Sequence, residues 1–178
     1  KRLSQAPGVH GPKKRQGALS SYGKQLLEKQ KAKYIYGIRE RQFRSVVEEA
    51  SRMTGDSGVN LNMLLERRFD NVIYRLGFAI TRAQARQMAT HSMFTLNGKK
   101  MNIPSHIVRV GDVIVLKEGK AKKKLFEKIE EQLQNANLPS WLSVDAKTKS
   151  GKVVSLPEAS DFDKTFDVTL IIEYFSQR

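Results

Sequence analysis

The side chains best suited to chemistry in this sequence are cations, and they are concentrated toward its N-terminus. Residues 1–44 hold 12 Lys and Arg against only Glu28 and Glu40, which gives a net charge of +10. Guanidinium and ammonium groups donate charge-assisted hydrogen bonds to phosphate oxygens, and Arg also stacks on bases. This concentration of donors predicts binding along a polyanion.

The charge of the whole chain supports the same interpretation. Its 178 residues include 32 Lys and Arg and 18 Asp and Glu, a net charge of +14. The excess falls to +5 over residues 45–136 and to −1 over residues 137–178. A strongly basic chain favours nucleic acid as its partner, and it argues against the classes of acidic small-molecule enzymes and acidic partner domains. The nearly neutral C-terminal segment is the better candidate for protein contacts.

The sequence carries no pattern typical of catalysis or metal binding. His10, His91 and His106 are isolated, without an HExxH pair or a Gly-x-Ser-x-Gly elbow. The carboxylates within residues 127–131 have no partner His and fit a solvated helix face. With no Cys there is no thiolate nucleophile, disulfide or Cys-type zinc site. We therefore expect no enzyme, cofactor or metal, although a site assembled only in three dimensions stays open.

The N-terminal segment predicts an arm rather than a folded element. Residues 7–17 combine Gly, Pro and cations without a hydrophobic period, which indicates an arm that orders against phosphates, with a disordered basic tail as the alternative. The sequence begins at Lys1 without an initiator Met, so we expect further residues in front of it. Its apolar runs are far shorter than the roughly 20 residues of a membrane helix, so no membrane partner is expected.

Helical patterns follow the arm. Helices are predicted over residues 20–34 and 38–53. Cations crowd the start of the second helix, where the helix dipole disfavours positive charge, and this suggests a ligand there. A longer apolar pattern, starting at Asn60 as cap and stopping at Gly77, predicts one buried helix. A capping box at residues 81–84 then opens a short helix to about His91.

The hydrophobic period then changes from helix to strand. Residues 94–103 contain Asn97-Gly98 between two short runs, which is typical of a β-hairpin with a type I′ turn, and residues 113–116 predict a further strand. Beyond a basic linker we expect a helix near residues 125–133, a core anchor at Trp141, and a strand over residues 166–175. The fold class is therefore α+β, with helices on a small antiparallel sheet.

Several motifs, in order along essentially the whole chain, resemble one known family. They are Pro7-Gly8-Val9-His10-Gly11, Tyr36-Gly37-Ile38-Arg39-Glu40-Arg41-Gln42-Phe43-Arg44, Leu65-Glu66-Arg67-Arg68-Phe69-Asp70-Asn71, Thr81-Arg82-Ala83-Gln84-Ala85-Arg86-Gln87, Leu96-Asn97-Gly98, Pro139-Ser140-Trp141-Leu142 and Ile172-Glu173-Tyr174-Phe175-Ser176. Together they resemble the bacterial-type small-subunit ribosomal protein S-four (uS-four) family, lacking the extreme N-terminal region. The middle module alone is also similar to RNA-binding domains attached to pseudouridine synthases, a tRNA synthetase and stress proteins.

The resemblance implies a domain organisation. Residues 1–59 would form a basic arm and helical rRNA-binding domain, and residues 60–124 an S-four-type RNA-binding module. Residues 125–178 would form a C-terminal helix and strand extension that packs on the other two, and the C-terminal segment could join the first domain.

The resemblance also implies a function. The family supplies a structural, non-enzymatic constituent of the small ribosomal subunit, a primary 16S rRNA-binding protein that nucleates assembly of the subunit body. It contributes to translational accuracy, lines the channel through which messenger RNA (mRNA) enters, and neighbours ribosomal protein S-five. The expected location is the ribosome of the cytoplasm, or that of an organelle. A free-standing RNA-binding regulator and a DNA-binding protein are the alternatives.

The candidate RNA-binding residues come from both kinds of reasoning. The charge pattern selects Lys29, Lys31, Lys33, Arg39, Arg41 and Arg44 as phosphate donors. The resemblance implies that Lys13, Lys14 and Arg15 lie near entering mRNA, and that Arg67, Arg82, Arg86, His91, Asn97 and Lys99 lie on the RNA-facing surface of the middle module. Arg82 and Arg86 are four residues apart and should share one helix face.

Overall fold

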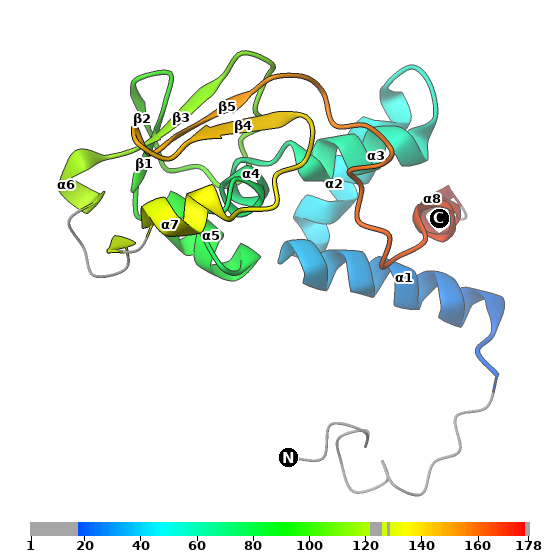
Figure 1. The fold of residues 1–178 in the computed structure, drawn as a ribbon. Helices are drawn as coiled ribbons and strands as arrows, with labels where there is room; N and C mark the ends of the chain where they lie inside the picture. The colour runs from blue at the N-terminus through cyan, green and yellow to red at the C-terminus, as the bar shows by residue number, and fades with distance from the viewer. Residues whose placement is uncertain (1–17, 122–125, 128, 177–178) are drawn as a thin grey trace, which may run out of the picture.

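The structure, a computed structural model, describes residues 18–121, 126–127 and 129–176 and contains two bodies side by side (Figure 1). One body is built of helices only, and the other is a small sheet with helices on it. The predicted class, α+β, is confirmed. The predicted arm, with Lys13, Lys14 and Arg15, lies outside the described residues.

Within the described ranges, four helices make up the helical body: α1 (Ser21–Tyr36), α2 (Glu40–Arg52), α3 (Ser57–Glu66) and α8 (Val168–Ser176). The side chain of Ser20 accepts a hydrogen bond from the Gly23 N–H and caps α1, and Gly37 ends it in the left-handed conformation. Phe43 of α2, Leu61 of α3 and Ile171 of α8 are completely buried in one apolar cluster. The two predicted N-terminal helices are therefore confirmed, with slightly shifted ends.

The prediction of one long helix after Asn60 is wrong, because the chain breaks between α3 and α4 (Phe69–Arg75). Arg68 is extended and bridges Ile107, and the Val108 N–H donates to the Arg67 carbonyl at 2.9 Å. The apolar residues before the break belong to the core of the helical body, and those after it to the core of the other body. A straight helix could not reach both cores.

Asn60 also has a different role from the predicted helix cap. Asp56 caps α3 by accepting from the Val59 N–H at 2.8 Å. Asn60 lies inside α3, where its side-chain amide donates to the carbonyls of Ala50 and Thr54. It therefore supplies a donor to carbonyl groups at the C-terminal end of α2 and just beyond it.

The second body, here called the sheet module, carries the predicted hairpin. Its strands are β1 (Phe94–Leu96), β2 (Lys99–Met101), β3 (Val113–Leu116), β4 (Leu142–Asp145) and β5 (Ser150–Val153), all antiparallel in the order β2-β1-β3-β5-β4. Leu96 pairs with Lys99, so Asn97 and Gly98 form a two-residue turn with φ of 49° and 76°. This confirms the predicted hairpin.

Helices cover one face of this sheet. They are α4, α5 (Arg82–Thr90) and α7 (Ile129–Gln134), while the short α6 (Glu118–Ala121) follows β3 (Figure 1). The side chain of Thr81 accepts from the Gln84 N–H at 3.1 Å, as the predicted capping box requires, whereas the Gln84 Oε1 accepts from the Ile80 N–H at 2.8 Å instead of from Thr81. Trp141 is completely buried, which confirms it as a core anchor.

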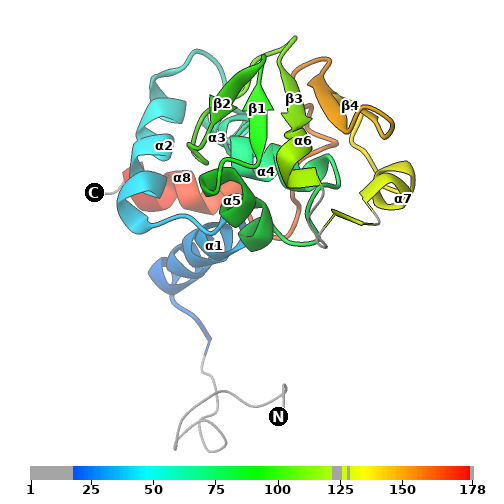
Figure 2. The same ribbon diagram turned by 90° about the vertical axis from the view of Figure 1, so that its left-hand side faces the viewer.

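The predicted C-terminal strand is wrong, because residues 168–176 form helix α8, which lies against α1 (Figure 2). β-branched and aromatic residues suggested a strand, but Val168, Ile171 and Phe175 also follow the helical spacing. Asp167 caps the helix by accepting from the Thr169 N–H at 2.9 Å. Residues 154–167, here called the return segment, lead from β5 back to the helical body (Figure 1).

The close approach of Gly77 to Ala136, two residues beyond the end of α7, offers a test of the core packing. Gly77 has φ +85°, and an added Cβ would lie 2.7 Å from the Ala136 Cβ, whereas Gly111 has φ +91° with nothing within 4 Å. We expect both alanine variants to lose about 1 kcal/mol of unfolding free energy through backbone strain. Gly77→Ala should lose a further ~1–3 kcal/mol through overpacking. Urea denaturation measures both, and equal losses would contradict the packing described at Ala136.

Candidate nucleic-acid interface

Two of the predicted phosphate donors are held by a carboxylate within the helical body. The Lys29 Nζ lies 2.7 Å from Glu40 Oε1 and 4.5 Å from the centre of the Tyr174 ring, and Lys29 is 4% exposed. The Lys33 Nζ lies 2.5 Å from Glu40 Oε2. Burial raises the pKa of the Glu40 carboxyl, but hydrogen bonds from both ammonium groups outweigh it and hold that pKa below its usual value. The Lys29 ammonium group is therefore bonded within the protein and takes a structural role.

The start of α2 presents arginines to solvent. Arg39, Arg41 and Arg44 are all exposed, and of these only Arg44 has an ion pair among the described residues, at 3.4 Å to Glu48. Arg39 stands at the N-cap, and no side chain caps the helix. Free N–H groups at a helix start and forked guanidinium groups both suit phosphate oxygens. Lys31 is also exposed, although it pairs with Glu28 at 2.6 Å.

On the sheet module the predicted residues divide between surface and structural roles. His91 at the end of α5 and Lys99 on β2 are exposed. Asn97 is exposed too, but its amide donates to Asp112 and its oxygen accepts from the Val113 N–H at 2.9 Å, so it ties the hairpin to β3. His91, Asn97 and Lys99 belong to the sheet module, whereas the arginines of α2 belong to the helical body.

Arg67 lies at the break between the two bodies and is half-buried. Its Nε donates to the Val108 carbonyl at 3.0 Å. Burial lowers the pKa of the Arg67 guanidinium, and the positive charge of Arg109 lowers it further. Part of its donor capacity is therefore used to hold the extended chain at the break.

Arg82 and Arg86 share one face of α5, as predicted, and that face meets the helical body. The Arg82 guanidinium lies over the rings of Tyr36 and Tyr74, with 4.9 Å and 4.8 Å to their centres. It also donates to Asn71 and to Asp163. The Arg86 Nη1 donates to the carbonyl of Gly37 at 3.0 Å.

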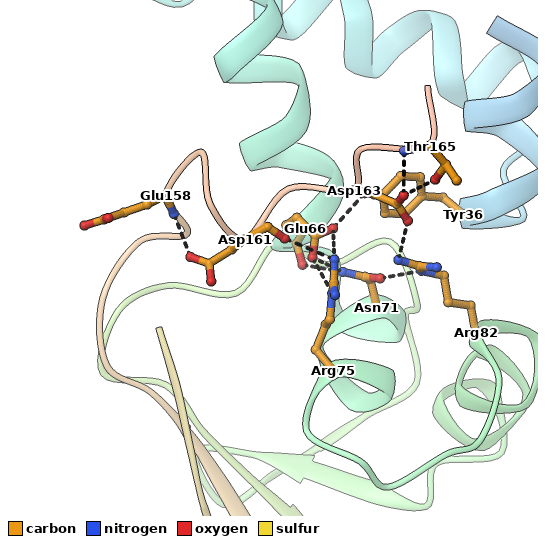
Figure 3. Close-up of polar contacts among 9 residues, drawn as sticks. All are labelled: Tyr36, Glu66, Asn71, Arg75, Arg82, Glu158, Asp161, Asp163 and Thr165. Carbon is orange, nitrogen blue, oxygen red and sulfur yellow. Dashed lines mark hydrogen bonds and ion pairs between the residues drawn. The ribbon is translucent and has the colours of Figure 1, made fainter. Parts of the chain in front are cut away.

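A buried carboxylate lies at the centre of this contact between the bodies (Figure 3). Glu66 is completely buried and accepts from Tyr36 Oη at 2.7 Å, from Asn71 Nδ2 at 2.8 Å and from both Nε and Nη2 of Arg75. Burial raises the pKa of the Tyr36 hydroxyl well above its ordinary value, and the charge of Glu66 adds to the effect. Burial lowers the pKa of Arg75, but the hydrogen bonds to Glu66 outweigh it and raise that pKa. We call these residues, with Arg82, Asp161 and Asp163, the joint.

Sequence reasoning missed two groups of residues. The sequence motifs include Glu66 and Tyr36 but give them no role of their own, and the signal for Glu66 is an acidic residue inside a strongly apolar helical pattern. Tyr34 is 82% exposed among the cations of α1, where an aromatic ring could stack on an unpaired base. The exposed cations Lys100 and Arg109 also lie outside the predicted set.

The described residues contain no group of three or more His, Asp or Glu side chains placed to hold a metal ion. No helix in the described ranges is both long and apolar enough to cross a bilayer. The exposed arginines of α2 offer hydrogen-bond donors and positive charge, which suit phosphate oxygens.

Known protein families divide the chain at the same break. Residues 1–66 match the ribosomal protein S4/S9 N-terminal domain, and residues 67–114 match the S4 domain. The small ribosomal subunit protein uS4 of Roseiflexus castenholzii is 49% identical over 173 residues, covering 96% of this chain and 84% of that protein. The chain belongs to the uS4 family. The family resemblance stated above is thereby confirmed.

Other uS4 proteins give the same result. Those of Herpetosiphon aurantiacus and Heliobacterium modesticaldum are 48% and 49% identical, each over 99% of this chain and 85% and 84% of their own length. The uS4 family consists of structural ribosomal proteins, so the prediction that this chain is no enzyme is confirmed. Its S4 domain is an RNA-binding module, in agreement with the predicted nucleic-acid partner.

The Tyr36 to Glu66 hydrogen bond predicts a particular dependence of stability on pH. Tyr36→Phe should lower the free energy of unfolding by about 1.5–3 kcal/mol at neutral pH, because a hydrogen bond to a buried charge is lost. Since the folded pKa of Tyr36 is raised above the 10.0 of a free tyrosine, its contribution is fully present below pH 10 and is lost as the pH rises through the folded pKa.

Urea denaturation between pH 8 and pH 11 measures this effect. The unaltered chain should lose more stability over that range than Tyr36→Phe does. Tyr34→Phe, which alters a hydroxyl of an 82% exposed residue, is the matched control and should follow the unaltered chain. Parallel curves for Tyr36→Phe and the unaltered chain would contradict the assignment.

Proposed function

We propose that this chain is a structural constituent of the small ribosomal subunit and a primary 16S rRNA-binding protein that nucleates assembly of the subunit body. The observation that carries this proposal is its likeness, over 96–99% of the chain, to proteins named small ribosomal subunit protein uS4. The basic composition supports it, because a net charge of +14 suits a chain neutralised by RNA.

The exposed cations would contact folded RNA through phosphates and 2′-hydroxyls. An A-form helix has a deep, narrow major groove, so proteins bind double-stranded RNA mainly by shape and backbone. In this proposal Arg39, Arg41 and Arg44 contact phosphates from the helical body, while Lys99 and His91 do so from the sheet module. Lys31 adds a weaker contact because Glu28 partly neutralises it.

The remaining predicted residues have different proposed roles. Lys29, Lys33 and Asn97 would stabilise the elements that carry the RNA-contacting surface, since their polar groups are bonded within the protein. Arg67 would contact RNA through the guanidinium N–H groups that do not donate to the Val108 carbonyl. Lys13, Lys14 and Arg15 would lie near mRNA where it enters the subunit.

We further propose that the chain contributes to translational accuracy and contacts neighbouring ribosomal proteins, ribosomal protein S-five among them. The C-terminal 42 residues carry a net charge of −1, so they have the least tendency to face RNA and the most to face protein. Sedimentation of cell extract through sucrose at moderate salt tests the ribosomal role. Absence from small-subunit fractions would overturn it in favour of a free-standing RNA-binding regulator.

The arginines of α2 provide a direct test of RNA binding. Replacing Arg39 and Arg41 together by Gln should weaken binding to the 5′ domain of 16S rRNA about tenfold or more and reduce the salt slope by about 1–2, because two phosphate contacts are lost. The matched control replaces Lys147 and Lys152 by Gln, which removes the same charge from exposed positions of the C-terminal segment.

Filter binding over a series of salt concentrations gives both affinity and slope. The control should retain most of its affinity. Equal losses in the two double variants would show that binding follows total charge and that the assignment to α2 is wrong.

A further inference from the structure

We propose that Arg82 is a positioning residue, which fixes the placement of the helical body relative to the sheet module and does not itself contact RNA. This inference rests on the proposed function, since it assumes that both bodies contact one RNA. It replaces the role that the family resemblance implied for Arg82.

The Arg82 guanidinium is bonded to other groups of the protein (Figure 3). Its Nε donates to Asn71 Oδ1 at 2.8 Å and its Nη2 to Asp163 Oδ2 at 3.2 Å. The side chain is 19% exposed, and its charged group lies over the Tyr36 and Tyr74 rings. Two acceptors and two aromatic rings thus fix the plane and direction of the guanidinium.

These partners come from separate passages of the chain. Tyr36 ends α1 in the helical body, Asn71 and Tyr74 belong to α4 in the sheet module, and Asp163 belongs to the return segment. One planar group therefore holds three passages in a fixed relation. Arg75 acts in parallel, because its Nη2 also donates to the Asp161 carbonyl of the return segment at 3.2 Å.

The apolar cores do not supply this relation. The buried apolar residues of the helical body and those of the sheet module form two separate clusters in the described part of the chain. Apolar packing is non-directional, whereas a guanidinium fork bonds in defined directions. The relative placement of the bodies therefore depends on directed polar contacts, which are those of the joint and the bond from Arg86 Nη1 to the Gly37 carbonyl.

Asp163 also makes the surroundings of Arg82 unfavourable for RNA. Burial raises the pKa of the Asp163 carboxyl, but hydrogen bonds from Thr165 and the charges of Arg82 and Arg75 outweigh it and lower that pKa. The carboxylate is therefore ionised next to Arg82. A phosphate approaching the guanidinium would meet this negative charge.

The inference makes opposite predictions from an RNA contact for three variants. If Arg82 positions the bodies, Arg82→Gln weakens binding to the 16S 5′ domain about 5- to 20-fold with an unchanged salt slope. Asp163→Asn also weakens binding although it makes the chain more positive, and the double variant is little worse than Arg82→Gln alone. Arg82→Lys keeps the charge but loses the fork, so it does not restore binding. A phosphate contact would instead reduce the salt slope by about 1 in Arg82→Gln, tighten binding in Asp163→Asn, and be largely restored by Lys.

A distance measurement tests the joint without RNA. The chain has no Cys, so Gln42→Cys on α2 and Lys152→Cys on β5 introduce one spin-label site in each body of the full chain. Double electron–electron resonance should give a narrow distribution of the distance between the two spin labels in this labelled parent. Arg82→Gln, Arg82→Lys and Asp163→Asn should broaden or shift it, while Arg41→Gln, a variant of the proposed RNA surface, should leave it unchanged. Far-UV circular dichroism confirms that each variant is folded.

The binding measurement and the distance measurement together distinguish a failure of the positioning role from a failure of the proposed function. An unchanged distance distribution in Arg82→Gln overturns the positioning role whatever happens to RNA binding. If the distance distribution broadens in the variants as expected but the labelled parent does not bind the rRNA, the proposed function is overturned and the positioning role of Arg82 stands. A reduced salt slope in Arg82→Gln together with tighter binding of Asp163→Asn overturns the inference in favour of direct RNA contact.

Discussion

The buried charge of Glu66 is the constraint on which the arrangement of the molecule depends. An ionised carboxylate without partners in a protein interior costs several kcal/mol, so its position demands donors. Tyr36 supplies one from the end of α1, and Asn71 and Arg75 supply the others from α4. Since these groups lie on different bodies, satisfying one carboxylate brings α1 and α4 together. The Tyr36 ring is then in place for Arg82, so the rest of the joint follows from this contact.

The same principle divides the cations of the chain into two populations. Arg68, Arg75 and Lys29 lie against Asp70, Glu66 and Glu40, and at least one partner in each pair is nearly or completely buried. Cations without a carboxylate in reach, such as Arg39 and Arg41, are left at the surface. Each of these pairs takes up one acidic and one basic residue. The ratio of basic to acidic residues among the remaining side chains is therefore higher than in the whole sequence. A carboxylate partner together with burial, more than position in the sequence, separates the structural cations from the exposed ones.

Sequence reasoning succeeded where neighbouring residues decide the structure. Thr81 caps a helix because Gln84 is three residues away, and Asn97-Gly98 makes a turn because its own backbone permits it. It failed where a distant partner decides. The break at Arg68 depends on pairing with Ile107, and residues 168–176 form a helix because they lie against α1 and α3. For Arg82 the spacing correctly gave the helix face, but only the fold shows that this face meets Tyr36 and Asp163.

A polar joint suits the proposed function, in which one protein holds two RNA-contacting surfaces at a defined separation. Two modest contacts joined in one molecule reinforce each other only when their spacing matches the sites on the RNA. An apolar interface of similar size could be more stable, but alternative packings of similar energy would give several spacings. Hydrogen bonds with fixed directions, such as those of Glu66 and Arg82, select one arrangement. A protein that already holds this arrangement loses less entropy when it binds a folded RNA. In the proposed complex, the arginines that shape the protein would therefore contribute to RNA affinity through the geometry that they impose.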